Sequence, residues 1–359
     1  MPAAAAWYHG WNETFSRREL PLMAMKALLL DRPGTPDTLR IGDIDLPAPG
    51  PGEIRVRVHA ASLNPADYKI MGGGLPTWTY PHIPGLDGAG VVDAVGPGAA
   101  PWKVGDRVYY HGDMTKRGAL AEYAVASAAA AARIPDAVSF ADAASIPTAG
   151  LTAYQALNRK MQLREGQTLL VHGGAGGVGG FAVQYAASVG ARVLATASAA
   201  NHDYVRSLGA EAVVDYTTES LRDRVMEWTN GEGVDAALNT VNRATAQADL
   251  ELLAFGGQLA CIAGAPENVA DFKPSSKTFT VHKLMLGGAF GHPKAEAELG
   301  ALAEEFVALY VERGFRSIVA ETIPLEDVPA ALVRLSGRHV RGKIVAWLGS
   351  LKEGEEFAG

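Results

Sequence analysis

Residues 168–186 read TLLVHGGAGGVGGFAVQYA, which places a glycine-rich loop between an apolar strand and a helical pattern. The glycines follow the spacing G-x-G-x-x-G. In this setting the first glycine permits a tight turn, the second lets the backbone approach a pyrophosphate, and the third lets the helix pack closely on the strand. The free N–H groups at the start of such a helix also favour phosphate. We therefore predict a dinucleotide-binding loop whose contact residues are Gly174, Gly176, Gly177, Val178 and Gly179.

The sequence around this loop alternates between strand-like and helical segments. The apolar runs RVLATAS, AEAVVDY, GVDAALNTV and GGQLACIAG follow one another up to about residue 288, with helical patterns between them. Such alternation is typical of a parallel sheet with helices on both faces. We predict an α/β fold in which residues 148–288 form a doubly wound Rossmann domain.

The residues on either side of this block have a different character. From 25 to 147, short apolar runs lie between Gly and Pro, and apolar and polar residues alternate in EIRVRVH, which favours a barrel-like β domain. Residues 289–359 hold a helical stretch and a final strand, GKIVAWLG, and we expect them to return to the β domain. Residues 1–24 form an N-terminal extension with aromatic side chains but no clear period. Two interpretations of it stay open: a natural start near Met25, or a segment that packs on the body of the protein.

The composition excludes several function classes. The 359 residues include 32 Lys and Arg against 39 Asp and Glu, a net charge of −7, which opposes nucleic-acid binding. Apolar runs fall short of the roughly 20 residues of a membrane helix, so no membrane role is expected. The single cysteine, Cys261, excludes an internal disulfide and a four-cysteine zinc site. These features favour a cytoplasmic protein.

The end of the second strand in the Rossmann block indicates which dinucleotide binds. Proteins that bind NAD usually carry an acidic residue there to hold the ribose 2′-hydroxyl. Here the strand ends ATAS, and Ser198 can donate to a 2′-phosphate, with Tyr216 further along the chain. No Lys or Arg directly follows Ser198. We predict NADPH as the cofactor, with NADH less favoured.

Several motifs also occur in a fixed order. They are LNPADYKI (63–70), PGLDGAGVV (84–92), VGDRVY (104–109), GLTAYQAL (150–157), HGGAGGVG (172–179) and GKIV (342–345). With them, the chain from about residue 25 to 348 resembles the zinc-free quinone oxidoreductases and enone reductases of the medium-chain dehydrogenase/reductase superfamily. The resemblance implies a GroES-like β domain, an active site in the cleft between the domains, and a small quinone or enone as substrate. It also implies a homodimer whose Rossmann sheet continues across the interface, with KLMLGGAF (283–290) as the edge strand.

The positions that would match the zinc ligands of alcohol dehydrogenases argue against a metal. Those enzymes hold zinc with two cysteines and a histidine, whereas this chain carries Asn64, Leu86 and Thr148 there. None of the three can supply the thiolate or imidazole that zinc prefers. We predict that the protein binds no zinc.

Reduction of a quinone or enone builds negative charge on oxygen, so the site needs hydrogen-bond donors. Asn64 can cap a short helix that begins at Pro65, or it can orient the substrate, as the resemblance implies. Tyr68 and Lys69 are candidate donors to the oxyanion. Trp78 and Tyr80 either pack under a Pro-rich loop or form an aromatic wall for a planar substrate. The resemblance implies further cofactor contacts from Thr152, Asn239, Val241, Gly264 and Lys343, although Lys343 can also be a solvated lysine.

Three alternatives remain. A zinc-dependent alcohol dehydrogenase-like enzyme is opposed by the missing ligands. An enoyl-thioester reductase of this superfamily uses a tyrosine shortly after the Asn-Pro motif, where this chain has Gly72, Gly73 and Gly74. A non-enzymatic NADPH-binding structural or RNA-associating protein is opposed by the acidic charge balance.

Overall fold

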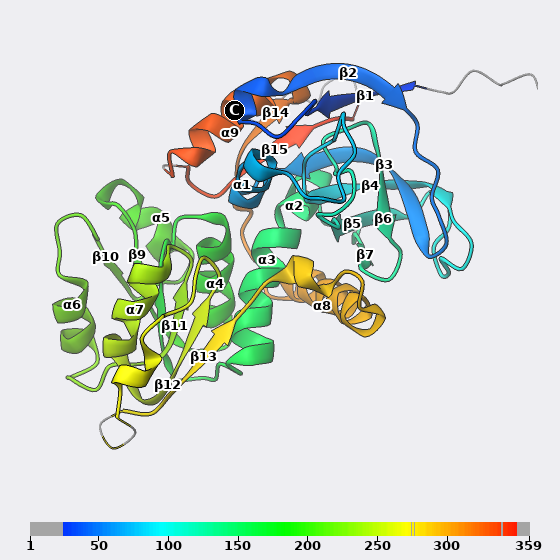
Figure 1. Ribbon diagram of the computed structural model, residues 1–359. Coiled ribbons are helices and arrows are strands. Elements are labelled where there is room, and N and C mark those ends of the chain that lie inside the picture. Colours follow the sequence, from blue (N-terminus) through cyan, green and yellow to red (C-terminus); the bar gives the residue numbers. More distant parts are fainter. Residues whose placement is uncertain (1–23, 274, 276, 339, 350–359) are drawn as a thin grey trace, which may run out of the picture.

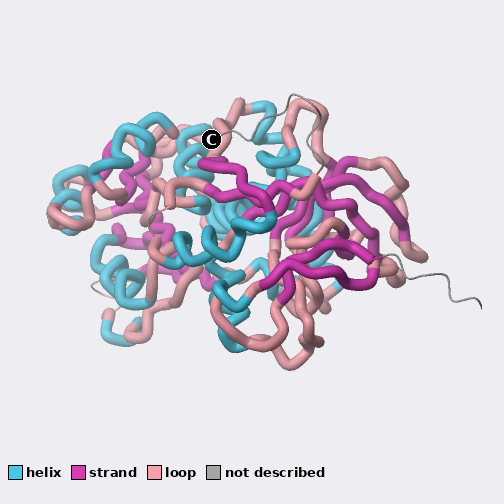
Figure 2. The backbone as a smooth tube through the Cα atoms, turned by 90° about the horizontal axis from the view of Figure 1, so that it is seen from above, coloured by secondary structure: helices cyan, strands magenta, loops and turns pink. Residues whose placement is uncertain are grey.

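The computed structural model describes residues 24–349 except 274, 276 and 339, so expectations for the N-terminal extension lie outside the described residues apart from Ala24. Figure 1 shows two lobes: the first and last parts of the chain form one, and the middle forms the other. Strands dominate the first lobe, whereas helices surround the strands of the second (Figure 2). The chain has the predicted α/β fold, with a GroES-like lobe and a Rossmann-like lobe.

The GroES-like lobe contains a seven-stranded sheet in the order β14-β15-β3-β4-β5-β7, with β6 paired to β3. These strands are β3 (Glu53–Ser62), β4 (Asp87–Val95), β5 (Arg107–His111), β6 (Tyr123–Ser127), β7 (Ala131–Arg133), β14 (Val319–Pro324) and β15 (Lys343–Trp347), and β1 (Ala24–Leu29) and β2 (Arg40–Asp45) form a separate antiparallel pair. In β3, alternation buries Ile54, Val56 and Val58. Because β15 pairs with β3, the last segment of the chain joins the sheet of the first.

The Rossmann-like lobe contains a six-stranded sheet in the order β10-β9-β8-β11-β12-β13, and every pair in it is parallel. Its elements are β8 (Thr168–Val171), α4 (Gly177–Ser188), β9 (Arg192–Thr196), α5 (His202–Ser207), β10 (Ala212–Val214), α6 (Leu221–Trp228), β11 (Val234–Asn239), α7 (Arg243–Leu252), β12 (Leu253–Cys261) and β13 (Phe279–Lys283). Leu169 and Val171 share one core cluster with Phe181 of α4, whereas Leu170 shares another with Leu250 of α7. Helices therefore cover both faces of the sheet.

The remaining helices are α1 (Pro65–Gly73), α2 (Phe140–Ser145), α3 (Pro147–Tyr154), which continues as a π-helical segment (Gln155–Lys160), α8 (Pro293–Glu312) and α9 (Val328–Ser336).

Helix α8 packs against both lobes. Tyr109 of β5 donates its hydroxyl to the carbonyl oxygen of Ala303 in α8 at 2.7 Å. On the other side, the ring of Phe306 in α8 lies 5.5 Å from that of Phe181 in α4. Among the described residues, no helix is long and apolar enough to cross a membrane.

The predicted edge strand of the Rossmann sheet is misplaced. The sheet ends at β13 (Phe279–Lys283), and most of KLMLGGAF lies beyond it, with the 3-10 helix η5 at Leu286–Ala289. Two consecutive glycines, Gly287 and Gly288, disfavour an extended strand there. Leu284 and Leu286 are buried instead against the core cluster that holds α3 and α8.

Candidate active site at the junction of the two lobes

The glycine-rich loop joins β8 to the N-terminus of α4. A Cβ atom on Gly179 would lie 2.1 Å from the carbonyl oxygen of Gly173, so no side chain fits there without a shift of the loop. Gly176 precedes α4 and provides no side-chain cap. The N–H groups of the first helical turn therefore remain available to an anion, and this cradle fits a dinucleotide pyrophosphate.

The same loop contacts the last strand of the GroES-like lobe. Gly176 and Gly342 form an isolated parallel bridge, and the N–H of Gly342 donates to the carbonyl oxygen of Ala175 at 2.7 Å. A Cβ atom on Gly177 would lie 2.8 Å from Cδ of Lys343. The stem of Lys343 thus packs directly against the predicted phosphate loop.

Lys343 is buried rather than solvated, at 4% exposure. Its Nζ donates to the carbonyl oxygen of Leu63 at 3.0 Å and to Oδ1 of Asn64 at 2.5 Å, and lies 3.4 Å from Oδ2 of Asp87. Burial lowers the pKa of Lys343, and the carboxylates of Asp87 and Asp67 oppose that shift. The ammonium is surrounded by three oxygen atoms from two separate parts of the chain, residues 63–64 and Asp87.

Asp87 is the centre of this buried polar group. Its carboxylate accepts hydrogen bonds from Ser62 Oγ at 2.8 Å, from Asn64 Nδ2 at 2.8 Å, and from both Thr148 N at 2.9 Å and Thr148 Oγ1 at 2.6 Å. We call Ser62, Asn64, Asp87, Thr148 and Lys343 the Asp87 cluster. Sequence reasoning did not single out Asp87 or Ser62, because their partners lie far away along the chain.

Asn64 is the N-cap residue of α1, as the sequence predicts, and Pro65 follows it as the first residue of the helix. It forms a capping box with Asp67, in which the backbone N–H of Asn64 donates to Oδ2 of Asp67 at 2.7 Å. Because its amide donates to Asp87 and accepts from Lys343, Asn64 holds the cluster together, and it is 2% exposed.

Asp67 is a second buried carboxyl group that sequence reasoning missed. It accepts from the N–H of Leu86 at 3.2 Å as well as from Asn64. Burial, with the nearby charge of Asp87, raises the pKa of Asp67 to about 7. The sequence could have indicated Asp67, because it lies three residues after the helix cap. An acidic side chain at that position accepts a hydrogen bond from the backbone N–H of the cap residue.

The two candidate donors on α1 lie apart from this network. Lys69 is exposed, and Tyr68 packs its partly buried ring against the core of the β lobe. In the described part of the chain, neither side chain forms a hydrogen bond or ion pair with the Asp87 cluster. Their assignment as oxyanion donors stays a prediction.

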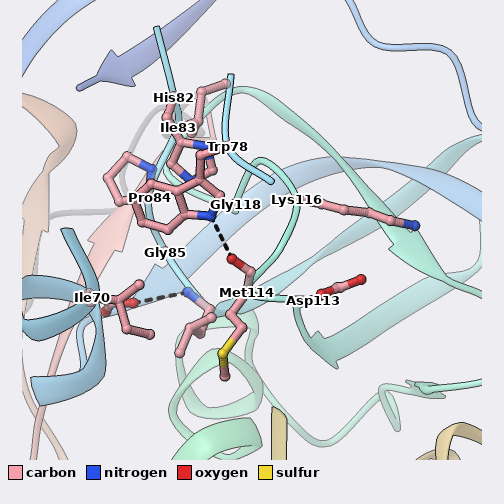
Figure 3. A pocket seen from close by; sticks show the side chains of 12 residues that line it. Ile70, Trp78, His82, Ile83, Pro84, Gly85, Asp113, Met114, Lys116 and Gly118 are labelled. Carbon is pink, nitrogen blue, oxygen red and sulfur yellow. Dashed lines mark hydrogen bonds between the residues drawn. The ribbon is translucent and has the colours of Figure 1, made fainter. Parts of the chain in front are cut away.

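Trp78 and Tyr80 differ in their surroundings. Trp78 stacks on His82 with ring centroids 3.7 Å apart and donates from Nε1 to the carbonyl oxygen of Met114 at 2.7 Å (Figure 3). Trp78 lines a pocket that also contains Asp67 and Met114, whereas Tyr80 is 38% exposed and does not line it. The hydrogen bond and the ring stacking hold the side chain of Trp78 in place. The same side chain also lines this pocket.

The residues proposed to read the 2′-phosphate lie near the end of β9. Ser198 is partly buried and its Oγ accepts from Asn201 Nδ2 at 3.0 Å, while Tyr216 is 57% exposed. Sequence reasoning found no cation directly after Ser198; in the fold, Cζ of Arg341 lies 5.0 Å from the ring centroid of Tyr204 in α5, the helix that follows Ser198. Arg341 directly precedes Gly342, which bridges to the glycine loop, so its backbone lies next to that loop while its side chain reaches α5.

Asn239 is fully buried at the end of β11 and is not free to bind a ligand through its side chain. Its Nδ2 donates to Oδ2 of Asp249 at 2.6 Å, and its Oδ1 accepts from the N–H of Val241 at 3.0 Å. Asp249 Oδ1 also bonds Nε2 of His172, which precedes the glycine loop, at 2.7 Å. The network fixes the turn at Val241 and the start of the loop relative to each other.

Thr152 and Gly264, whose contacts with the cofactor stay predictions, have the following surroundings. Thr152 is buried on α3. Gly264 follows β12 with φ +133°, a conformation that a residue with a side chain rarely adopts.

The three positions that correspond to zinc ligands meet at this junction. Asn64 and Thr148 both donate to Asp87, and Leu86 has no donor atom in its side chain. In the part of the chain that the structure describes, no three His, Cys, Asp or Glu side chains are placed to hold a metal ion. The residues present do not fit a catalytic zinc.

Comparison with known proteins supports this architecture. The family Alcohol dehydrogenase GroES-like domain matches residues 50–136, and the family Zinc-binding dehydrogenase matches residues 177–305. The quinone oxidoreductase of Pseudomonas aeruginosa is 32% identical over 87% of this chain and 96% of its own length. Phthioceranic/hydroxyphthioceranic acid synthase of Mycobacterium tuberculosis is 39% identical over 64% of this chain. The matched region makes up only 11% of the length of that synthase.

Solved structures agree. Quinone oxidoreductase of Pseudomonas syringae superposes with a TM-score of 0.82 at 30% identity, covering 91% of this chain and 100% of that one. A mycobacterial protein solved in complex with NADPH gives a TM-score of 0.81 at 31% identity, covering 90% of this chain and 100% of that one. The fold and the junction define an oxidoreductase with a GroES-like and a Rossmann-like lobe. The chain belongs to the medium-chain dehydrogenase/reductase superfamily, in its quinone oxidoreductase-like group.

Proposed function

We propose that this protein reduces quinones or α,β-unsaturated carbonyl compounds with NADPH and without a metal. The observation that carries the proposal is the contact between the phosphate loop and the Asp87 cluster, through Gly342 and Lys343. This contact supports the proposal because it brings the glycine loop, which we propose as the cradle for the pyrophosphate, next to a buried polar site at the lobe junction. When bound, the nicotinamide supplies a hydride.

The protein's own residues would bind and orient the reactants. The glycine loop and the start of α4 would hold the pyrophosphate, with Ser198, Tyr216 and Arg341 near the 2′-phosphate. Thr152, the turn at Val241 and the backbone at Gly264 would border the nicotinamide. In an enone, the hydride reaches the β-carbon, charge develops on the carbonyl oxygen, and a proton from solvent reaches the α-carbon. The overall reaction consumes NADPH and H⁺ and yields NADP⁺ and the saturated ketone.

A panel of acceptors tests the proposal. Purified protein is mixed with NADPH and with 1,4-benzoquinone, 2-cyclohexenone or trans-2-hexenal, and the loss of NADPH absorbance is followed. Turnover of a quinone or enone, with less than one zinc per ten chains by elemental analysis, supports it. Binding of NADPH without oxidation by any acceptor would favour the non-enzymatic alternative, and stoichiometric zinc would contradict the metal-free chemistry.

An enoyl-thioester substrate is the second candidate, because the synthase from Mycobacterium tuberculosis matches this chain at 39% identity. Adding crotonyl-N-acetylcysteamine to the panel separates the two. A kcat/KM for the thioester far above that for every quinone and enone would replace the first proposal with this one.

We also propose a homodimer, with β13 (Phe279–Lys283) as the exposed edge of the Rossmann-like sheet that a second copy would extend. Burial of Met285, which is 67% exposed beside this edge, would follow from such pairing. Sedimentation velocity of the wild type and of Val281→Pro, which removes a backbone donor from β13, tests the assembly. A monomeric wild type would contradict it.

A further inference from the structure

His111 is the last residue of β5, and its cross-strand partner in the antiparallel sheet is Asp87. Side chains of directly opposed residues point to the same face of a sheet. The imidazole of His111 therefore faces the side of the sheet on which the Asp87 cluster lies. The charges of Asp87 and Lys343 both act on the pKa of His111, in opposite directions, as expected of a ring close to both.

The ring of His111 is buried, but its Nδ1 has no hydrogen-bond partner among the described residues. The residue is 4% exposed. A buried polar atom left unpaired costs about 1–3 kcal/mol. Tyr109, two residues earlier on the same face, shows the contrast, because its hydroxyl is satisfied by α8.

The ring also lies next to the segment that follows β13 of the Rossmann-like lobe. The ring centroid of Phe290 lies 6.1 Å from that of His111, with the planes 22° apart. A Cβ atom on Gly287 would lie 3.8 Å from Cε1 of His111. His111 thus stands between the Asp87 cluster and the segment that follows β13.

The donors of the Asp87 cluster are already used. Asn64 Nδ2 donates to Asp87 and to the carbonyl oxygen of Ser62, and the hydroxyls of Ser62 and Thr148 donate to Asp87. The three N–H groups of the Lys343 ammonium have three oxygen acceptors, from Leu63, Asn64 and Asp87. An acceptor that enters this junction finds no free donor in the cluster, whereas His111 offers a ring nitrogen.

We propose that His111 donates a hydrogen bond from its ring to the carbonyl oxygen of the quinone or enone, and is a catalytic residue of this protein. The inference rests on the proposed function, in which negative charge develops on that oxygen. Burial has the largest effect on the pKa of His111 and lowers it, which favours the neutral ring, and a neutral imidazole carries one N–H donor. The substrate oxygen would satisfy the nitrogen that the protein leaves unpaired.

Kinetics of two substitutions test the role. His111→Leu removes the donor with little change in volume, and His111→Gln keeps one. We expect kcat/KM for 2-cyclohexenone to fall roughly 100-fold in His111→Leu, and less than tenfold in His111→Gln, with an unchanged Kd for NADPH. His59→Leu is the matched control, because His59 lies in the same sheet with an unpartnered Nε2 but stacks on Phe140 at 4.5 Å. We expect it to keep wild-type kinetics.

A second measurement needs no variant. In wild-type protein saturated with NADP⁺, adding the unreactive ketone cyclohexanone should shift the ¹⁵N resonances of the His111 ring, assigned through its contact with Phe290, and leave those of His59 in place. Resonances that do not move, or a His111→Leu variant that turns over enone within threefold of wild type, would overturn the role of His111 while leaving the proposed function intact. A wild type inert toward every acceptor would instead overturn the proposed function, and the resonance shift would still decide whether His111 binds a carbonyl.

Discussion

Lys343 and Asn64 are 279 positions apart in sequence, yet Nζ of the lysine lies 2.5 Å from Oδ1 of the asparagine. This hydrogen bond joins the last strand of the chain to the first turn of α1. Because Gly342, the neighbour of Lys343, bridges to the phosphate loop, the same short segment connects the Rossmann-like lobe to the Asp87 cluster. Disturbing it should affect stability and cofactor binding together.

Lys343→Met should therefore destabilise the protein strongly. The substitution keeps the apolar stem but leaves Asp87 buried without its cation, which typically costs about 3–5 kcal/mol. Urea unfolding followed by circular dichroism measures the loss, and the Kd for NADPH should rise in parallel. Lys294→Met, at an exposed lysine of α8, should leave both quantities unchanged. Adding Asp87→Leu to Lys343→Met should recover part of the stability, and a further loss would contradict the pairing.

The local patterns of the sequence predicted the Rossmann-like lobe because each one is written in consecutive residues. Strand, glycine loop and helix all lie within 168–186, and the alternation of β3 is visible in EIRVRVH. The Asp87 cluster has no such local signature. Asp87 meets Thr148 and Lys343 across 61 and 256 positions, and only the closed sheet brings them together.

The same difference explains what the sequence did not reveal. Asn64 is the helix cap that the sequence predicts, but its amide also donates to the buried carboxylate of Asp87, and that partner is invisible in the local sequence. Arg341 was not considered because a cation was sought directly after Ser198, whereas Arg341 reaches Tyr204 of α5 from the far end of the chain.

Asp67 should make the stability of the protein depend on pH. Its folded pKa of about 7 exceeds the ordinary 3.8, so the folded state binds an extra proton between these values. Its contribution to stability is fully present below about pH 3.8 and is lost as the pH rises through about 7. In Asp67→Asn this contribution disappears, and the slopes of unfolding free energy against pH should differ from wild type by at most about 1.4 kcal/mol per pH unit. Asp37→Asn, at an exposed aspartate, should keep the wild-type slope.

Gly179→Ala should impair the phosphate loop. The new Cβ would lie 2.1 Å from the carbonyl oxygen of Gly173 and 2.9 Å from Cα of Gly174, so the loop must move away from α4. We expect a lower melting temperature and at least a tenfold weaker Kd for NADPH, measured by calorimetry. Gly72→Ala is the control, because a Cβ there meets nothing within 4 Å inside α1 and should raise helix stability slightly. Unaltered NADPH binding by Gly179→Ala would show that the loop does not hold the cofactor.

Arg341 provides a test of cofactor choice, because its effect on the 2′-phosphate of NADPH can be separated from any effect on the parts that NADPH and NADH share. If its guanidinium meets the 2′-phosphate, Arg341→Ala removes a charge-assisted hydrogen bond of about 1.5–3 kcal/mol, which corresponds to a roughly 10- to 100-fold weaker Kd for NADPH. NADH lacks that phosphate, so its Kd should stay the same, and the ratio of the two constants isolates the effect. Arg334→Ala, at an arginine of α9 that pairs with Glu321 instead, should leave the ratio at the wild-type value. Equal weakening of both cofactors by Arg341→Ala would place the arginine at the shared pyrophosphate, and no weakening of either would remove it from the site.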